Sequence, residues 1–373
     1  MAIHHITPIL ILALSWATSV QGVVASKPVK TQQEQEAWLV QLADKRFTQW
    51  DHNHNGILEL EEVDREVENH SVRGREAAVM VCLRRHLASK DNQPRLSREE
   101  LLALFRDRAF EKSVEAAAKK LETIDRALFL PTDPDLATFH QGRLGDCYLL
   151  SVIAAEAHRS PAALRGMIRP VVTGGFEVVF GNGQKIKVEF ITDSELLLGA
   201  RMDSNHGSWL AVLEKAYGII RQHTRAKKEN KPLNSREVVP VETLSGGDTR
   251  PIISLLTGHQ AASQPLNKSG KREQLHTLLV DLTKKRRLIC LSVHNDNHPP
   301  GIVNKHAYAL MAYDGQLRKA TVFNPWGNTF TPKGMPGLTN GYTTQHGLFS
   351  VPLDEVQQVF TALSYETDKA LPK

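Results

Sequence analysis

The most distinctive stretch of the chain reads Gln141-Gly142-Arg143-Leu144-Gly145-Asp146-Cys147-Tyr148-Leu149-Leu150. It joins a glycine-containing turn to the start of an apolar run long enough for a helix, with a cysteine at the junction. A helix N-terminus favours negative charge through its unpaired N–H groups, so the sequence predicts a stabilised thiolate at Cys147. Gly145 lets the backbone approach a substrate closely, and Gln141 carries an amide able to donate to a developing oxyanion.

Two short blocks follow far downstream. His306-Ala307-Tyr308 opens an apolar segment that reads as a buried strand, and Asn324-Pro325-Trp326-Gly327 follows another such segment. A thiol needs a base to become a nucleophile, and the base needs a partner that orients it. Cys147, His306 and Asn324 supply these three parts. Trp326 is expected at the substrate site, where it shields the His306–Asn324 hydrogen bond from water.

Together, these blocks closely resemble the calpain family of papain-like cysteine proteases. The stretch from Gln141 to Leu150 matches the cysteine motif of that family, with Tyr148 where calpains usually have Trp. Two further segments are similar to calpain segments, namely Leu213-Glu214-Lys215-Ala216-Tyr217 and Leu244-Ser245-Gly246-Gly247. The resemblance covers about residues 130–367, which is essentially a whole protease core.

The resemblance implies an endopeptidase that acts on proteins or peptides. In it Cys147 is the nucleophile, His306 the base and then the acid, Asn324 the orienting residue, and Gln141 a donor in the oxyanion hole. Gly246 and Gly247 would line the cleft and bond the backbone of an extended substrate.

The chain also departs from the calpain pattern. Lys305 stands immediately before the histidine, where calpains have Gly, and Thr138 stands where we expect an Asp that binds calcium within the calpain core. Calcium binding by the core itself is therefore not predicted.

A calcium loop is predicted in front of the core. The twelve residues from Asp51 to Glu62 fit an EF-hand loop, in which Gly56 permits the sharp turn and Leu58 packs on a paired loop. The expected ligands are Asp51, Asn53, Asn55, the carbonyl of Ile57, Glu59 and Glu62. Only three of them are charged, so we expect a weak Ca²⁺ site suited to extracellular calcium.

A second, degenerate loop follows. Counting back from Glu100 puts Ser89, Asp91, Gln93 and Pro94 at the key positions, and most of these are poor ligands or turn residues. The sequence therefore predicts an EF-hand pair in which only the first loop binds. An EF-hand pair ahead of the core is similar to the arrangement in a secreted, prokaryotic-type calpain relative.

The N-terminus has the layout of a secretory signal peptide, with an apolar stretch from Ile6 to Ala17 followed by small residues. We expect secretion or a periplasmic location, with no membrane association after the signal is removed. The three cysteines are too few for a disulfide scaffold, so Cys82 and Cys290 are expected to be buried core thiols.

Composition excludes a nucleic-acid partner. The net charge of +5 comes from 46 basic and 41 acidic residues, and the basic runs lack the aromatic platforms that nucleic-acid surfaces use.

The predicted fold is α+β, with a two-lobed papain-like core whose helical lobe bears the thiol and whose antiparallel-strand lobe bears the base. Four segments are expected: a signal peptide at residues 1–25, the EF-hand pair at 26–106, a helical linker at 107–129, and the catalytic core at 130–373.

Three alternatives stay open. The same three residues also serve acyl transfer, including transamidation, and a catalytically inactive member would be a calcium-dependent binding protein. Residues 26–130 would alternatively form a pro-segment that is removed. The sequence leaves the oligomeric state and the substrate undecided.

Overall fold

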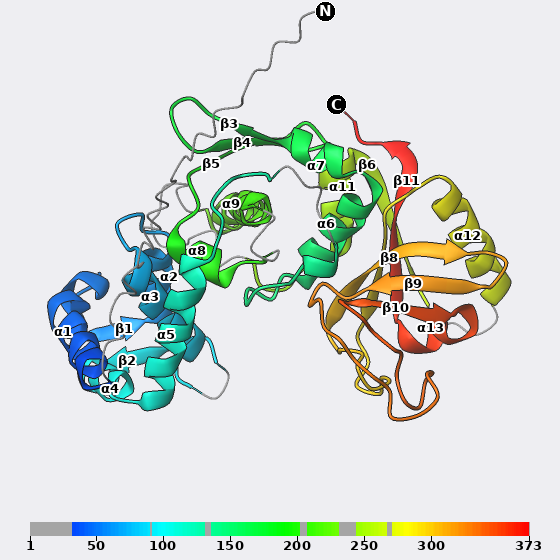
Figure 1. The fold of residues 1–373 in the computed structure, drawn as a ribbon. Helices are drawn as coiled ribbons and strands as arrows, with labels where there is room; N and C mark the ends of the chain where they lie inside the picture. Colours follow the sequence, from blue (N-terminus) through cyan, green and yellow to red (C-terminus); the bar gives the residue numbers. More distant parts are fainter. Residues whose placement is uncertain are drawn as a thin grey trace, which may run out of the picture.

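The computed structural model describes residues 32–89, 92–130, 136–201, 207–230, 244–266 and 271–372. The predicted signal peptide, Asp91 of the second loop and the prolines near residue 131 lie outside these ranges. The described residues form helices around three antiparallel sheets (Figure 1). No helix among them has the length and apolar character needed to cross a membrane.

The N-terminal unit consists of two helix–strand–helix segments. Its elements are α1 (Gln32–Trp50), β1 (Ile57–Glu59), α2 (Leu60–Val67), α3 (Gly74–Leu87), β2 (Arg95–Ser97) and α4 (Arg98–Phe105). The two short strands pair in antiparallel fashion with Leu58 opposite Leu96, so the loops that precede them lie side by side. Leu58 is buried, as the sequence predicts for the apolar residue of the first loop.

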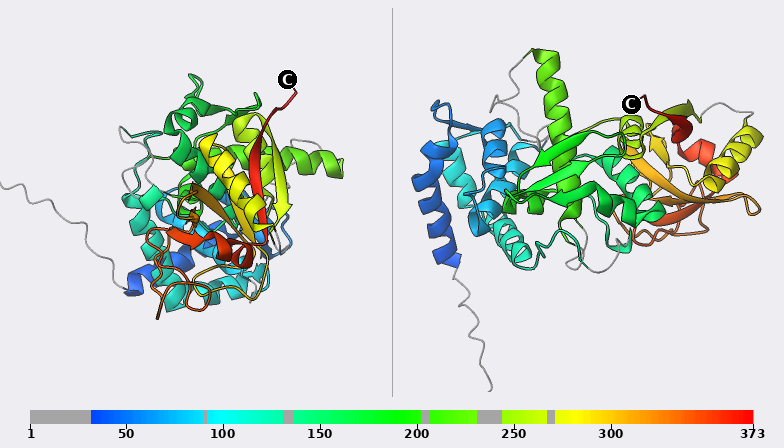
Figure 2. Two further views of the ribbon diagram at one scale, coloured as in Figure 1. Left: turned by 90° about the vertical axis from the view of Figure 1, so that its right-hand side faces the viewer. Right: turned by 90° about the horizontal axis from the view of Figure 1, so that it is seen from above.

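The helical lobe follows the N-terminal unit. It contains α5 (Arg108–Glu122), η1 (Leu136–Thr138), α6 (Cys147–Arg159), α7 (Pro161–Met167), β3 (Ile168–Pro170), β4 (Phe176–Val179), β5 (Lys185–Val188), α8 (Asp193–Leu198), α9 (Trp209–Glu229) and α11 (Thr249–Thr257). β4 and β5 form an antiparallel hairpin, with Val178 opposite Ile186. α9 runs for 21 residues to Glu229, and its last turns project from the body of the molecule (Figure 2).

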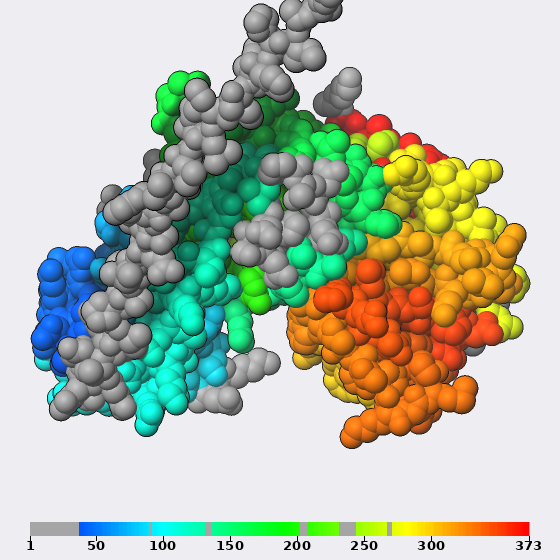
Figure 3. Space-filling model, in the orientation of Figure 1, coloured from blue at the N-terminus to red at the C-terminus, as the bar shows by residue number. Residues whose placement is uncertain are grey.

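The strand lobe is a six-stranded sheet in the order β10-β9-β8-β7-β11-β6. Its elements are β6 (His259–Pro265), α12 (Arg272–Lys284), β7 (Ile289–Val293), β8 (His306–Asp314), β9 (Lys319–Phe323), β10 (Leu348–Pro352), α13 (Leu353–Val359) and β11 (Ala362–Ala370). Figure 3 shows the molecule hollowed between this lobe, in orange, and the N-terminal helices, in blue to cyan.

The two faces of this sheet divide the core. Cys290, Ala307 and Ala309 belong to the large cluster shared with the helical lobe. Leu291, Tyr308 and Leu310 belong to a second cluster that packs against α12 and α13. Successive strand residues point to opposite faces, so one strand supplies both clusters. The small residues lie on the face where α6 packs across β8, which lets the helix approach closely.

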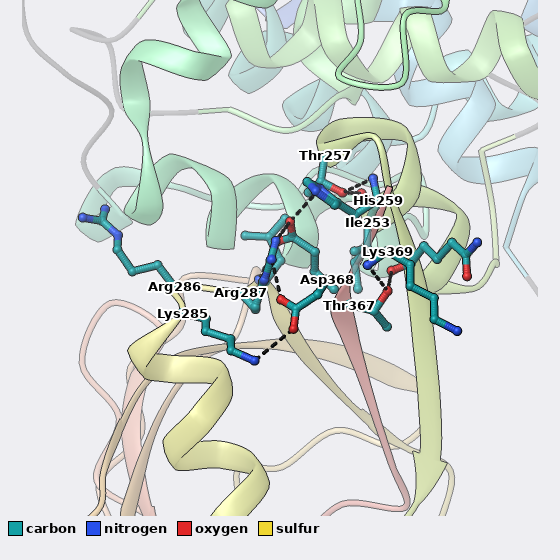
Figure 4. A network of polar contacts seen from close by, with 12 residues as sticks. Ile253, Thr257, His259, Lys285, Arg286, Arg287, Thr367, Asp368 and Lys369 are labelled. Atoms are coloured by element: carbon teal, nitrogen blue, oxygen red, sulfur yellow. Dashed lines mark hydrogen bonds and ion pairs between the residues drawn. The ribbon is translucent and has the colours of Figure 1, made fainter. Parts of the chain in front are cut away.

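A charge network centred on the buried Glu366 ties the end of α6 to β11. Glu366 is 1% exposed and accepts hydrogen bonds from Arg159 at 2.6 Å and Arg287 at 2.8 Å. Asp368 lies two residues after Glu366 on the same strand. It forms ion pairs with Lys285 at 2.9 Å and with Arg287 at 2.6 Å (Figure 4). The network fixes α6 against the sheet and so fixes the two lobes relative to each other.

Candidate active site

Cys147 begins α6, as the sequence predicts, and its side chain is partly exposed. The preceding Asp146 is fully buried, and its carbonyl accepts the backbone N–H groups of Leu149 and Leu150. Because α6 packs across β8, the thiol lies against the backbone N–H of Ala307, the residue after His306. Close packing of the two lobes therefore brings the cysteine and histidine blocks together.

His306 and Asn324 form a buried pair. The imidazole Nε2 lies 2.8 Å from the Asn324 Oδ1, and the two residues are 4% and 1% exposed. The Asn324 amide is itself held, because it donates to Asn328 Oδ1 at 2.9 Å. An amide oxygen accepts a proton, so Nε2 carries the hydrogen and Nδ1 is left as the basic nitrogen.

Two aromatic rings enclose this histidine. The centroids of Tyr308 and Trp326 lie 4.9 and 5.0 Å from that of His306. Trp326 is 46% exposed, so one part of it covers the imidazole while the rest faces solvent. This position agrees with the shielding expected of Trp326.

The protonation equilibria differ from the thiolate expected at a helix N-terminus. Burial raises the pKa of the Cys147 thiol and outweighs the opposing effect of the Ala307 N–H, and the Asp146 carboxyl raises it further. Burial likewise lowers the pKa of His306 to about 4, against the effect of Asn324. Desolvation disfavours the charged form of each group, so burial favours the neutral thiol and the neutral imidazole.

Gln141 is anchored beside the cysteine loop. Its backbone N–H donates to the Pro325 carbonyl at 2.7 Å, which joins the loop to the block that contains Asn324. Its side-chain amide lies against the Asp146 carboxyl, a contact that the sequence did not predict. A primary amide carries two hydrogens, so one remains for another acceptor.

Two glycines, one in the cysteine loop and one bonded to it, adopt left-handed backbone conformations. Gly145 and Gly246 each have φ of +69°, and the Gly246 N–H donates to the Gly145 carbonyl at 3.1 Å. A Cβ on Gly247 would lie 2.4 Å from the Tyr148 ring. The glycine segment, residues 244–247, therefore lies directly against the cysteine loop.

The comparison with known families agrees with this geometry. The family described as calpain family cysteine protease matches residues 110–334, which is more than half of the chain. The chain belongs to the calpain family of cysteine proteases. No curated protein matches it. The family match begins within α5, so it covers the helical lobe and much of the strand lobe but not α1 to α4.

The residue before His306 has an unusual backbone conformation. Lys305, which stands where calpains have Gly, has φ of +51°, and its N–H is held by Asn304 Oδ1 at 2.7 Å. That conformation costs a residue with a Cβ about 1–2 kcal/mol. The positive φ at this position explains why calpains have Gly there. In this chain Lys305 adopts the same positive φ at a cost in strain.

Sequence reasoning missed a buried carboxyl pair. Asp146 is fully buried and Glu214 is 2% exposed, and the two lie against each other. Burial, followed by the neighbouring Asp146, raises the pKa of Glu214 well above its usual range. Glu214 accepts the Ala200 N–H at 2.8 Å, so the pair supports the turn after α8. The available signal was an acidic residue in the mostly apolar first half of α9.

In the N-terminal unit, the first loop is organised around two buried carboxylates. Asp51 accepts the N–H of Gly56 at 2.8 Å, and Glu62 accepts those of Glu59 at 3.0 Å and Asn53 at 3.2 Å. Within the described ranges, no basic side chain forms an ion pair with either. The Asp51 and Glu62 carboxylates thus accept backbone hydrogen bonds, but no basic side chain neutralises their charge.

The donor set fits a hard cation through oxygen atoms of several kinds. In the part of the chain that the structure describes, no three His, Cys, Asp or Glu side chains converge closely enough to hold a metal by themselves. A site here therefore depends on Asn53, Asn55 and the Ile57 carbonyl as well as on carboxylates, as calcium loops do.

Proposed function

We propose that this chain is a secreted cysteine endopeptidase with a calcium-binding EF-hand pair in front of its protease core. The observation that carries the catalytic part is the His306–Asn324 hydrogen bond next to a partly exposed cysteine at a helix start. These are the parts that thiol-based peptide hydrolysis requires.

The reaction begins from the neutral pair. As Cys147 Sγ attacks the substrate carbonyl carbon, its proton passes to His306 Nδ1, and the carbonyl electron pair moves onto oxygen. The backbone N–H at the start of α6 and the second Gln141 amide hydrogen are the proposed donors to that oxyanion. Asn324 holds Nε2–H and stabilises the imidazolium.

Collapse of the tetrahedral species breaks the C–N bond. The leaving amine takes the proton from His306, which leaves a thioester on Cys147. Water then attacks the thioester while His306 accepts its proton, and the thiolate is expelled and protonated again. Gly246 and Gly247 are the proposed partners of the substrate backbone, with Gly145 and Trp326 beside them.

For the N-terminal unit, the proposal assigns Ca²⁺ to Asp51, Asn53, Asn55, Ile57, Glu59 and Glu62. The ion would neutralise the buried carboxylates and hold the loop closed. The paired strands β1 and β2 and the buried Leu58 support the EF-hand interpretation. Secretion rests on the apolar N-terminal segment of the sequence.

The test compares cleavage of casein by the chain from residue 26 onward with cleavage by its Cys147→Ala variant, in calcium at about the millimolar level of extracellular sites. We expect cleavage by the wild type alone. Cleavage by both proteins would overturn the assignment of the nucleophile. Incorporation of an amine into casein without cleavage would instead identify a transferase.

A further inference from the structure

Tyr148, the residue after the proposed nucleophile, bonds two separate segments through its hydroxyl. It donates to the Leu244 carbonyl at 2.9 Å and accepts from Arg221 Nη1 at 2.6 Å. The residue is 2% exposed, so both bonds are made in a largely desolvated place. Burial also raises the pKa of Tyr148 above its usual range, which keeps the hydroxyl protonated as a donor.

Arg221, on α9, joins this hydroxyl to the glycine segment. The same Nη1 that donates to Tyr148 also donates to the Gly246 carbonyl. The guanidinium carbon lies 5.6 Å from the centroid of the Tyr148 ring. One arginine therefore contacts the residue next to the cysteine and the segment opposite it.

Contacts at Leu244, Gly246 and Gly247 hold the glycine segment in place, but one side of Gly246 is open. Leu244 is bonded through its carbonyl, Gly246 through its carbonyl and its N–H, and Gly247 packs on the Tyr148 ring. In contrast, a Cβ built on Gly246 meets no atom within 4 Å. The side of Gly246 on which a Cβ would lie is therefore open to another molecule.

A tryptophan at position 148, as calpains usually have, would fill this place differently. The indole N–H is a donor only, so it would not accept from Arg221. The hydroxyl of Tyr148 both donates and accepts, and this allows the bridge from Leu244 to Arg221. The bridge is thus a feature of this chain's own residues.

We propose that Tyr148 and Arg221 are positioning residues that hold the glycine segment at the proposed nucleophile so that its backbone can bond an extended peptide substrate. This inference rests on the proposed endopeptidase function. It assigns the two side chains an effect on peptide binding and none on the intrinsic reactivity of the thiol.

The experiment separates these two effects with two alkylating probes. Iodoacetamide needs only the thiol, whereas a peptidyl epoxide also needs the backbone partners of the substrate. Rates with both probes, and kcat/KM for a fluorogenic peptide, are measured for the wild type, Tyr148→Phe, Arg221→Met and the double variant. Tyr313→Phe is the matched control, because its hydroxyl is bonded to His276 at 2.7 Å in the strand lobe.

We expect Tyr148→Phe to lower kcat/KM and the epoxide rate by about tenfold, as the loss of two hydrogen bonds implies. The iodoacetamide rate should stay within about twofold of the wild type on this reasoning. Arg221→Met should behave in the same way, and the double variant should lose less than the product of the two losses, because both act on one network. Tyr313→Phe should resemble the wild type.

Three results would overturn the inference. The first is a kcat/KM of Tyr148→Phe equal to that of an active wild type. The second is an equal loss of rate with iodoacetamide and with the epoxide. The third is an Arg221→Met variant whose rates equal those of the wild type. Arg221 is only partly buried, so its variant decides the matter if Tyr148→Phe fails to fold. A wild type that neither cleaves peptide nor reacts with the epoxide, yet reacts with iodoacetamide, would overturn the proposed function as well.

Discussion

The Thr192 hydroxyl donates a 2.6 Å hydrogen bond to the carbonyl of Val67, 125 residues earlier in the chain. Thr192 caps α8, and Val67 ends α2 of the N-terminal unit. At the other end of α8, the Leu198 carbonyl accepts the N–H of Arg143 in the cysteine loop at 2.9 Å. One short helix therefore connects the N-terminal unit with the loop that carries Cys147.

The first prediction concerns this connection. Thr192→Val removes the helix cap and leaves the buried Val67 carbonyl unpaired, so we expect the free energy of unfolding to fall by about 2–4 kcal/mol. Urea titration checks this, and Thr192→Ser should restore most of the loss. The control is Thr224→Val, whose exposed hydroxyl bonds within its own helix and whose loss should cost under about 0.5 kcal/mol.

The same contacts bear on the pro-segment alternative. The N-terminal helices and the helical lobe share one hydrophobic cluster, in which Leu39 and Cys147 both take part. Removal of residues 26–130, as that alternative requires, would expose part of that cluster. A stable, active protein without those residues would show that the contacts are dispensable.

The second prediction concerns pH. Burial raises the pKa of Cys147 and lowers that of His306 to about 4, so both groups are neutral at about pH 6. Alkylation by iodoacetamide follows the thiolate fraction and should therefore rise continuously from about pH 6 to about pH 9. Measured rates that are fast and constant between about pH 5 and pH 7 would instead indicate a thiolate–imidazolium pair.

The third prediction concerns calcium. Glu62→Gln removes a charge from the proposed site but keeps a side chain that can complete the capping box of α2. Calcium at about ten times its Kd should stabilise the wild type by about 1.4 kcal/mol and this variant far less. Thermal unfolding with and without calcium measures the difference. Glu61→Gln, the exposed neighbour, should respond like the wild type.

The fourth prediction concerns Lys305. Its left-handed backbone should be relieved by Lys305→Gly, which we expect to raise the free energy of unfolding by up to about 1 kcal/mol after the entropy of glycine is counted. Lys333→Gly is the matched change on an exposed residue without positive φ, and it should not raise the free energy of unfolding. Equal urea midpoints for the two variants would contradict the strain argument.

The fifth prediction compares two acids on β11. The side chain of Glu366 is 2% exposed and that of Asp368 is 60% exposed, although both pair with Arg287. Glu366→Gln removes the buried carboxylate that Arg159 and Arg287 share. Because Arg159 keeps Glu156 and Arg287 keeps Asp368 as partners, the loss should be about 1.5–3 kcal/mol. Asp368→Asn should cost under about 1 kcal/mol, because its ion pairs are open to water. Chemical denaturation measures both, and similar losses would contradict the role of burial.

Local patterns in the sequence predicted much of the fold. The apolar run after Cys147 is α6, and the apolar segment that opens at His306 is β8, which pairs with β7. Each follows from the spacing of apolar and turn residues, which is a property of neighbours in the chain. The order of the cysteine, histidine and asparagine blocks likewise indicated the family.

Tertiary structure alone decided the chemistry around those blocks. Burial raises the pKa of Cys147, packing brings Glu214 to Asp146, and α9 brings Arg221 to Tyr148. These effects depend on desolvation and on contacts between residues far apart in sequence, which no local pattern encodes. The sequence determined which groups the site contains, and the packing of the lobes determined their protonation and their partners.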